Sequence, residues 1–189
     1  MTESDLLRLI REASAAKDPL LVAIDGRCGS GKTTLAARLA ESLDASLFHM
    51  DDFFPRPEQR TPERLSQPGE NVDHERFGEE VLRPLLRGDR VIRFRPFDCA
   101  SMALAAPMEV PVRPVVLIEG SYSCHPSLWD AYDLRLFLTI SPEEQFHRIL
   151  LRNGPEKAEV FRSRWIPMEE AYFTRYQIQA RCDHTLTCP

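Results

Sequence analysis

Gly26-Arg27-Cys28-Gly29-Ser30-Gly31-Lys32-Thr33 stands between an apolar run at residues 20–24 and a segment with leucines on one helical face at positions 35, 39 and 43. The apolar run is short and contains β-branched residues, which is typical of a buried parallel strand. Glycines let the main chain curl until successive N–H groups point at one anion, and the start of the following helix adds partial positive charge. Residues 26–33 therefore predict an anion-binding loop between a strand and a helix, and hence an α/β fold.

The spacing of this loop is that of the pattern G-x-x-x-x-G-K-[ST], which holds the phosphates of a nucleoside triphosphate. The Lys32 ammonium can reach the β- and γ-phosphates, and the Thr33 hydroxyl can hold Mg²⁺. Cys28 occupies a variable position of the pattern, and we expect it to take no part in catalysis. We expect ATP as the ligand, with GTP as the alternative, held by Gly26, Arg27, Cys28, Gly29, Ser30, Gly31, Lys32, Thr33 and Thr34.

Composition narrows the class of protein. The length of 189 residues suits one α/β domain, and the formal net charge of -5 argues against a general nucleic-acid surface, which needs clustered Lys and Arg. No apolar run approaches the ~20 residues of a membrane span, and the acidic start of the chain is unlike a signal peptide. The five cysteines, at positions 28, 99, 124, 182 and 188, lack metal-binding spacing, so we expect reduced thiols in a cytoplasmic protein.

Strand-like and helix-like segments alternate along the chain. This order predicts a three-layer α/β/α phosphate-loop fold with a mostly parallel sheet. Ser141, Pro142 and Glu144 form a strong helix start, with a serine cap and a capping box. Residues 53–71 are rich in proline and predict a long surface excursion. Further strands are expected at residues 46–50, 91–95 with a return at 108–110, 115–120, 134–140 and 184–187, and helices at 6–13, 73–88, 141–153 and 166–180, with a single turn at 126–129.

Acidic residues follow two of the expected strands. The ligand crevice of such a sheet lies beyond the carboxyl ends of its strands, so these acids should meet the phosphate loop there. Asp51 or Asp52 could accept the proton of an attacking hydroxyl, the alternative being a helix or turn cap. Glu119 could support Mg²⁺ through water, the alternative being a structural role. His49, at a strand end, is expected to be packed and not catalytic.

Arginines follow the last long strand. Arg148 and Arg152 are four residues apart and share a helical face, and Arg162 and Arg164 come later. A phosphoryl-transfer enzyme needs cations over the transferring group and a flap that excludes water. We expect a lid at about residues 152–165, the alternative for these arginines being a solvated charged face.

The stretch from about residue 53 to 112 is expected to hold an acceptor substrate. Asp73 is also placed to cap a helix, so it could do either job or both. Phe97 could stack on a ring of the acceptor, or it could belong to the core.

Together these segments resemble the uridine kinase family of small phosphate-loop kinases, which includes phosphoribulokinase and type I pantothenate kinase relatives, over residues 20–186. The resemblance implies that Asp51, in Asp51-Asp52-Phe53-Phe54, is the general base, with Phe54 beside the substrate. It also implies that Asp73 contacts sugar hydroxyls and that Phe97 lies beside the base. By the same resemblance, Glu119 is the acidic strand end, and Arg148 and Arg152 begin the lid.

The sequence also departs from that family. The histidine that follows the hairpin motif in uridine kinases has no counterpart in residues 99–102, and Phe97 lacks a tyrosine hydroxyl. The Arg-Gly-Arg of the lid is missing. A site that distinguishes uracil from other rings needs placed hydrogen-bonding groups, so the phosphate-donor half of the resemblance is the better supported one.

The leading hypothesis is ATP-dependent phosphorylation of a small-molecule hydroxyl, foremost a nucleoside 5′-hydroxyl. One alternative is a kinase for a sugar, a pantothenate-like compound or a ribosyl-nicotinamide compound. Another is a non-catalytic ATP-binding switch, although the Asn-Lys-x-Asp run usual in guanine-specific switches does not occur. Neither nucleic acid nor membrane is an expected partner, and the sequence leaves a homo-oligomer open.

Overall fold

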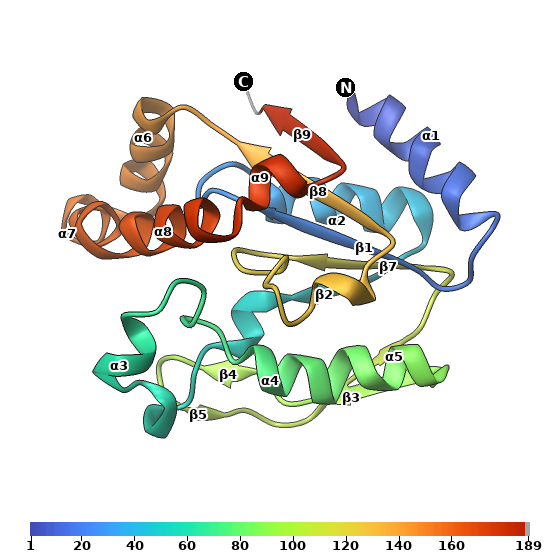
Figure 1. Ribbon diagram of the computed structural model, residues 1–189, viewed down its shortest axis with the longest axis horizontal. Coiled ribbons are helices and arrows are strands. Elements are labelled where there is room, and N and C mark those ends of the chain that lie inside the picture. The colour runs from blue at the N-terminus through green and yellow to red at the C-terminus, as the bar shows by residue number, and fades with distance from the viewer. Residues whose placement is uncertain (188–189) are drawn as a thin grey trace.

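The computed structural model describes residues 1–187, and Cys188 lies outside the described residues. A parallel sheet forms its centre, with the strand order β2-β7-β1-β8-β9 (Figure 1). Helices cover both faces of this sheet, so the predicted three-layer α/β/α phosphate-loop fold is confirmed. The strands of the central sheet are β1 (Leu20–Gly26), β2 (Ser46–His49), β7 (Val115–Glu119), β8 (Leu134–Thr139) and β9 (His184–Thr187).

The middle strand β1 separates two hydrophobic cores. Its side chains alternate between the faces of the sheet, because successive residues of a strand point to opposite sides. Leu20, Val22 and Ile24 pack in one core with residues of α1 and α2. Leu21 and Ala23 pack in the other core with residues of α4, α5 and α8. Being buried on both faces explains why the strand reads as a continuous apolar run in the sequence.

The helices close the two outer layers. In Figure 1, α1 and α2 lie on one side of the sheet and α4 and α5 on the other. A π-helical stretch, Gly78–Leu82, joins α4 to α5, so these form the single helical segment expected at residues 73–88. The helices are α1 (Glu3–Ser14), α2 (Lys32–Leu43), α3 (Pro62–Leu65), α4 (His74–Phe77), α5 (Arg83–Arg87), α6 (Pro142–Asn153), α7 (Pro155–Val160), α8 (Ile166–Tyr176) and α9 (Ile178–Arg181).

Two small antiparallel pairs lie apart from the main sheet. The predicted return strand is confirmed, because β6 (Met108–Pro111) pairs with β3 (Val91–Phe94). A shorter pair joins β4 (Phe97–Asp98) to β5 (Ala103–Leu104). In Figure 1, β3 to β5 lie near α4 and α5 and away from α1 and α2.

Two local expectations differ from the structure, and a third element is longer than expected. The turn expected at 126–129 is closed by the Trp129 N–H, which donates to the Pro126 oxygen (3.4 Å), and it continues into the 3₁₀ turn Trp129–Ala131. The helix expected at 166–180 is interrupted at Gln177, whose φ of 53° is left-handed and therefore ends α8. Ser141 caps α6 by accepting from the N–H of Glu144, but among the described contacts the Glu144 carboxylate accepts from Arg148 Nε (2.7 Å) and no reciprocal bond from the Ser141 N–H completes a capping box.

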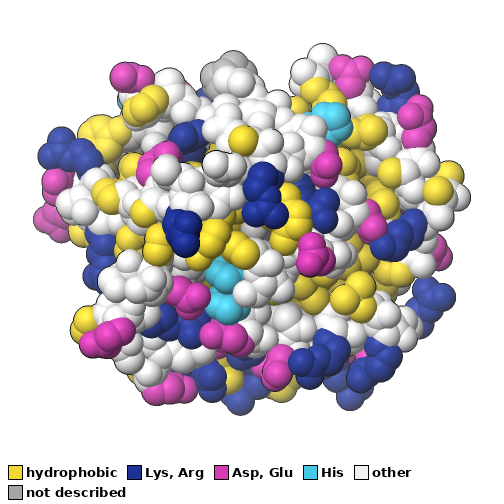
Figure 2. All heavy atoms as spheres, in the orientation of Figure 1, with side chains coloured by type: hydrophobic (Ala, Val, Ile, Leu, Met, Phe, Trp, Pro, Cys, Tyr) yellow, Lys and Arg dark blue, Asp and Glu magenta, His cyan; other side chains and the backbone are white. Residues whose placement is uncertain are grey.

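The surface carries charges of both signs. On the face shown in Figure 2, Lys and Arg side chains are interspersed with Asp and Glu side chains. Within residues 1–187, no helix has the length and apolarity required to cross a bilayer. Four cysteines, Cys28, Cys99, Cys124 and Cys182, are free, as predicted for them.

Phe53 joins the segment after β2 to the core and provides a test of that core. It is fully buried, with the ring of Phe77 4.9 Å away edge-on and that of Phe94 stacked at 5.4 Å. Phe53→Ala should lower the free energy of unfolding by about 3–5 kcal/mol, because the cavity left behind closes only in part. Urea denaturation measures this loss. Leu151→Ala, at a side chain that is 74% exposed, is the control and should cost less than about 0.5 kcal/mol.

Candidate active site

The phosphate loop turns sharply at Gly26, the last residue of β1. Gly26 has a φ of +137°, and a Cβ there would lie 2.0 Å from the main-chain oxygen of Leu138. Only glycine fits this close approach of two neighbouring strands. The loop ends at Gly31, whose φ of +91° starts α2 at Lys32. The main-chain N–H groups between Gly26 and α2 are thereby gathered at a helix N-terminus, as anion binding requires.

Lys32 is held inside this loop. Its ammonium donates to the main-chain oxygens of Gly26 (2.6 Å) and Arg27 (3.0 Å), and the residue is only 7% exposed. The Ser121 hydroxyl lies 3.5 Å from the same nitrogen. Among the residues described, no carboxylate pairs with Lys32, so its charge remains available to an anion in the loop.

The buried Asp25 carboxylate, next to the phosphate loop, connects the loop to other elements. Its carboxylate accepts from the N–H groups of Gly26 (2.7 Å), Tyr122 (3.2 Å) and Cys124 (2.9 Å) and from the Tyr172 hydroxyl (2.8 Å). Burial raises the pKa of Asp25 to about 6, although these hydrogen bonds and the charge of Lys32 oppose the rise. Through this one side chain, the end of β1 is tied to the loop after β7 and to α8.

Glu119 and Thr33 form the candidate Mg²⁺ site. The Thr33 hydroxyl donates to Glu119 Oε2 at 3.3 Å. Mg²⁺ prefers hard oxygen ligands and keeps several waters, so a hydroxyl and a carboxylate side by side at the phosphate loop fit this ion. Both residues were predicted for this site from the sequence.

His49 was expected only to pack at its strand end, but it also contacts Glu119 of the candidate Mg²⁺ site. The parallel register of β2 and β7 places it opposite Glu119, and its Nδ1 lies 2.5 Å from Glu119 Oε1. This hydrogen bond raises the pKa of His49, against the opposing effect of burial. A signal was present in the sequence, since His49 ends one strand and Glu119 another, but the register that pairs them was not visible there.

Asp51 follows β2 in the 3₁₀ turn Met50–Phe53 and lines the central cavity. The surrounding protein displaces water from its carboxylate, and this desolvation, followed by repulsion from Glu119, raises the pKa of Asp51. Lys32, His49 and Arg152 act in the opposite direction. Asp52 does not line this cavity, and desolvation raises its pKa as well.

One cavity of about 630 Å³ joins the phosphate loop to the segments expected to hold an acceptor. Of the predicted site residues, its lining includes Cys28, Gly29, Gly31, Lys32, Thr33, Thr34, Asp51, Phe54, Glu119, Arg148 and Arg152. Gly26, Arg27, Ser30, Asp73 and Phe97 do not line it.

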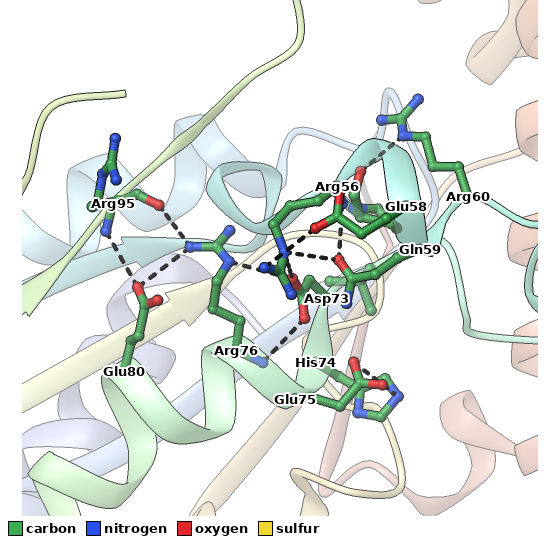
Figure 3. A network of polar contacts seen from close by, with 12 residues as sticks. Arg56, Glu58, Gln59, Arg60, Asp73, His74, Glu75, Arg76, Glu80 and Arg95 are labelled. Atoms are coloured by element: carbon green, nitrogen blue, oxygen red, sulfur yellow. Dashed lines mark hydrogen bonds and ion pairs between the residues drawn. The ribbon is translucent and has the colours of Figure 1, made fainter. Parts of the chain in front are cut away.

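Asp73 lies inside a network of arginines (Figure 3). Its carboxylate is 1% exposed, accepts from the N–H of Arg76 as the cap of α4, and lies 3.3 Å from Arg76 Nε and 3.4 Å from Arg56 Nε. The capping role is therefore present in the structure. Phe97 is 5% exposed, and the Arg60 guanidinium lies 5.6 Å from its ring centre. Neither side chain lines the cavity.

The lid region is helical. Gly154 separates α6 from α7, and a π-helical stretch, Phe161–Trp165, leads directly into α8. Arg148 Nε donates to Glu144, and Arg152 Nε donates to the Asn153 side chain (2.9 Å). Arg162 pairs with Glu159 at 2.7 Å and is largely exposed, so it lies on the outer side of the lid. Arg164 is also exposed and lies over the Trp165 ring.

Sequence reasoning missed several residues of the cavity. Arg60, Asn71, Ser121, Tyr122, Trp165 and Glu169 all line it. Asn71 stood in the segment singled out for the acceptor, whereas Glu169 carried no signal beyond its place on an expected helix. The reason is that its position at the loop depends on how α8 packs over β1.

A cluster of Glu70, His74 and His125 lies outside this cavity. The two imidazole rings stack in parallel, 4.0 Å apart and inclined by 13°, so an ion in the plane of one ring would lie far from the plane of the other. His125 Nδ1 accepts from the Ser127 N–H, which leaves the proton of the neutral ring on Nε2. Burial and His74 lower the pKa of His125 to about 3. We therefore interpret the cluster as a packing contact and not as a metal site.

Comparison with known proteins agrees with this geometry. No family model matches the chain. The uridine kinase of Ureaplasma urealyticum serovar 10 is 27% identical over 160 residues, which are 78% of this chain and 75% of that protein. A possible uridine kinase from Bacillus stearothermophilus superposes with a TM-score of 0.70 at 20% identity, over 98% of this chain and 100% of that one. A structure described as a candidate fructose transport system kinase from Silicibacter sp. TM1040 gives a TM-score of 0.76 at 22% identity, over 98% and 99% of the two chains.

These similarities confirm the resemblance to the uridine kinase family. The likeness to the Ureaplasma enzyme is one of sequence, and the two solved structures share the phosphate-loop fold of this chain.

The raised pKa of Asp25 predicts a dependence of stability on pH. Its pKa is 3.8 in the unfolded chain and about 6 in the folded protein, so between these values the folded state retains a proton that the unfolded state has lost. The contribution of Asp25 to the free energy of unfolding therefore falls as the pH rises from about 4 to about 6, by at most about 1.4 kcal/mol per pH unit. Chemical denaturation of the wild type and of Asp25→Asn across this range measures it as a difference. A difference that stays constant with pH would contradict the assignment.

Proposed function

We propose that this protein transfers the γ-phosphoryl group of ATP to a hydroxyl group of a small molecule, with a nucleoside 5′-hydroxyl as the first acceptor to test. The observation that carries the proposal is a single cavity that joins the phosphate loop to Asp51, a carboxylate at the end of a different strand. The similarity to uridine kinases supports a nucleoside as the acceptor. GTP is the alternative donor.

The phosphate loop would bind and orient the donor. Its N–H groups and the Lys32 ammonium offer positive charge to the β- and γ-phosphates, and Lys32 would turn from the carbonyl oxygens of Gly26 and Arg27 toward them. Thr33 and Glu119 would hold Mg²⁺, which when bound neutralises charge on the phosphate oxygens. His49 holds the Glu119 carboxylate in place from the neighbouring strand.

Asp51 would accept the proton of the attacking hydroxyl at its carboxylate. A raised pKa makes this carboxylate a stronger base than an ordinary aspartate, while the charges of Lys32, His49 and Arg152 favour its ionised form. Its place at the end of β2, beside the strand that carries Glu119, brings the base to the donor end of the cavity.

The lid would exclude water from the transfer. Arg148 and Arg152 bring positive charge to the cavity, and Phe161 and Trp165 give it an apolar wall. Cations over the transferring group stabilise its charge, and an apolar wall removes the water that would otherwise compete as acceptor. In this proposal residues 152–165 are the lid of a single kinase domain, and residues 53–112 form its acceptor side.

A second candidate acceptor is a small alcohol that carries an anionic group. Arg60 lines the cavity, and its Nε donates to the main-chain oxygen of Pro55 (2.8 Å). In Figure 3 its guanidinium points away from the network around Asp73, and no carboxylate of the described chain lies within ion-pair distance of it. Cys99 and Met102 line the cavity, and neither offers the strong hydrogen-bonding groups that recognition of a nucleoside base would require. An arginine with free donors suits a carboxylate or a phosphate.

Asp51→Asn should lower kcat by about 10²- to 10⁴-fold and leave ATP binding unchanged, because the substitution removes only the base. ADP release with uridine, cytidine and a panel of other small alcohols measures turnover, and calorimetry measures binding. Because its pKa is raised, Asp51 should give kcat/KM an acidic limb above pH 3.8 that the asparagine variant lacks.

Asp52→Asn is the matched control, since the neighbouring carboxylate does not line the cavity; it should retain most activity. Unchanged turnover in Asp51→Asn would refute the base assignment. ATP binding without turnover of any acceptor would favour the nucleotide-dependent switch.

Arg60→Gln separates the two classes of acceptor. If the acceptor is anionic, the variant should raise its KM by about tenfold or more with little change in kcat, because a charge-assisted hydrogen bond to the ligand is lost. The probes are 3-hydroxy acids and sugar phosphates beside uridine. Arg93→Gln, at an exposed side chain paired with Glu109, is the control. Turnover of uridine alone, with a KM that Arg60→Gln leaves unchanged, would exclude the anionic acceptor.

A further inference from the structure

Glu169 on α8 places a negative charge at the phosphate loop. Its Oε2 accepts from the main-chain N–H of Cys28 at 3.0 Å, and its Oε1 accepts from the Ser121 hydroxyl at 2.6 Å. The residue is 6% exposed, and it lines the same cavity as Cys28 and Lys32. A carboxylate of α8 therefore accepts from an N–H group of the loop that we propose receives phosphate.

This charge is not neutralised by a cation. Within residues 1–187, no Lys, Arg or His forms an ion pair with Glu169, and Lys32 reaches it only through the Ser121 hydroxyl. The next residue differs, because Glu170 pairs with Arg27 through two contacts of 2.6 and 3.0 Å. α8 therefore contacts two successive loop residues. Glu170 forms an ion pair with Arg27, whereas Glu169 accepts from the main-chain N–H of Cys28 without a cationic partner among the described residues.

We propose that Glu169 is an internal anion that competes with the donor's phosphates for the phosphate loop, and that donor binding therefore displaces α8. The proposal rests on the nucleotide binding proposed above. A polyphosphate brings several negative charges to the loop that Glu169 touches, and like charges in a partly buried site repel strongly. Coupling of this kind is reciprocal, so the helix that carries Glu169 lowers donor affinity as much as the donor loosens the helix.

The indole of Trp165 provides a fluorescence probe for the proposed displacement of α8. This residue precedes Glu169 by one helical turn, belongs to the π-helical stretch continuous with α8, and lines the cavity. The chain has two tryptophans, so a Trp129→Phe background leaves Trp165 as the sole indole.

Glu169→Gln is the decisive variant. The glutamine oxygen can still accept from Cys28 and its amide can donate to the Ser121 oxygen, so the contacts persist while the charge is removed. We expect Mg-ATP and ADP to bind about tenfold more tightly, with a lower KM for ATP and no gain in kcat. The Trp165 fluorescence change on adding Mg-ATP should shrink, because the repulsion that moves the helix is gone.

Glu12→Gln is the matched control, since it removes the same charge from an exposed position on α1, outside the proposed lid and the cavity. Calorimetry with Mg-ATP should give the same affinity for this variant as for the wild type. Equal or weaker binding in Glu169→Gln, in protein whose melting curve shows it folded, would overturn the inference and leave Glu169 as a support of the loop. Absence of binding in both proteins would refute the proposed function itself and this inference with it.

Discussion

The parallel register of three neighbouring strands determines the site. β7 pairs with β1 on one side and with β2 on the other, so the ends of all three strands meet at one edge of the sheet. Main-chain hydrogen bonds thereby bring together Gly26, Glu119 and His49, which are far apart in the sequence. The turn after β2 then adds Asp51. Because these bonds are made by the backbone, the relative positions of the loop, the candidate metal ligands and the candidate base do not depend on any single side chain.

The second core connects this edge to the rest of the molecule. Asp25 bonds Tyr172 of α8, and Phe53 packs between Phe77 and Phe94. α8 therefore reaches the phosphate loop through a buried hydrogen bond as well as through Glu169. Since Tyr172 holds α8 in the core and Glu170 pairs with Arg27 of the loop, the contact of Glu169 can change while these other contacts persist.

The sequence predicted what depends on local pattern. The loop, its flanking strand and helix, the mostly parallel sheet implied by alternation and the acids at strand ends all follow from spacing and apolar runs. Asp73 shows the limit: its capping role, which also brings Arg76 beside it, was visible, but its contact with Arg56 depends on how the segment between these two residues folds back. Glu169 shows it more clearly, since only the packing of α8 over β1 brings a glutamate 141 residues away to the N–H of Cys28. The sequence pattern predicted most of the helices and strands, but it did not predict the side-chain contacts between segments that are distant along the chain.

The two ends of the cavity differ in chemistry, and this difference bears on specificity. Beside the phosphate loop the cavity is lined by Lys32 and three carboxylates, Asp51, Glu119 and Glu169, so charge dominates this end. In the proposed reaction the acceptor end would have Phe54 and Met102, with Asn71 and Arg60 as its polar groups. Main-chain groups bind phosphate whatever the acceptor is, whereas a ring or an acid is distinguished only by side chains with placed donors. Relatives that share the loop can therefore differ in acceptor through a few residues of the segment between β2 and β7, where this chain lacks the histidine and the tyrosine of the uridine kinase pattern.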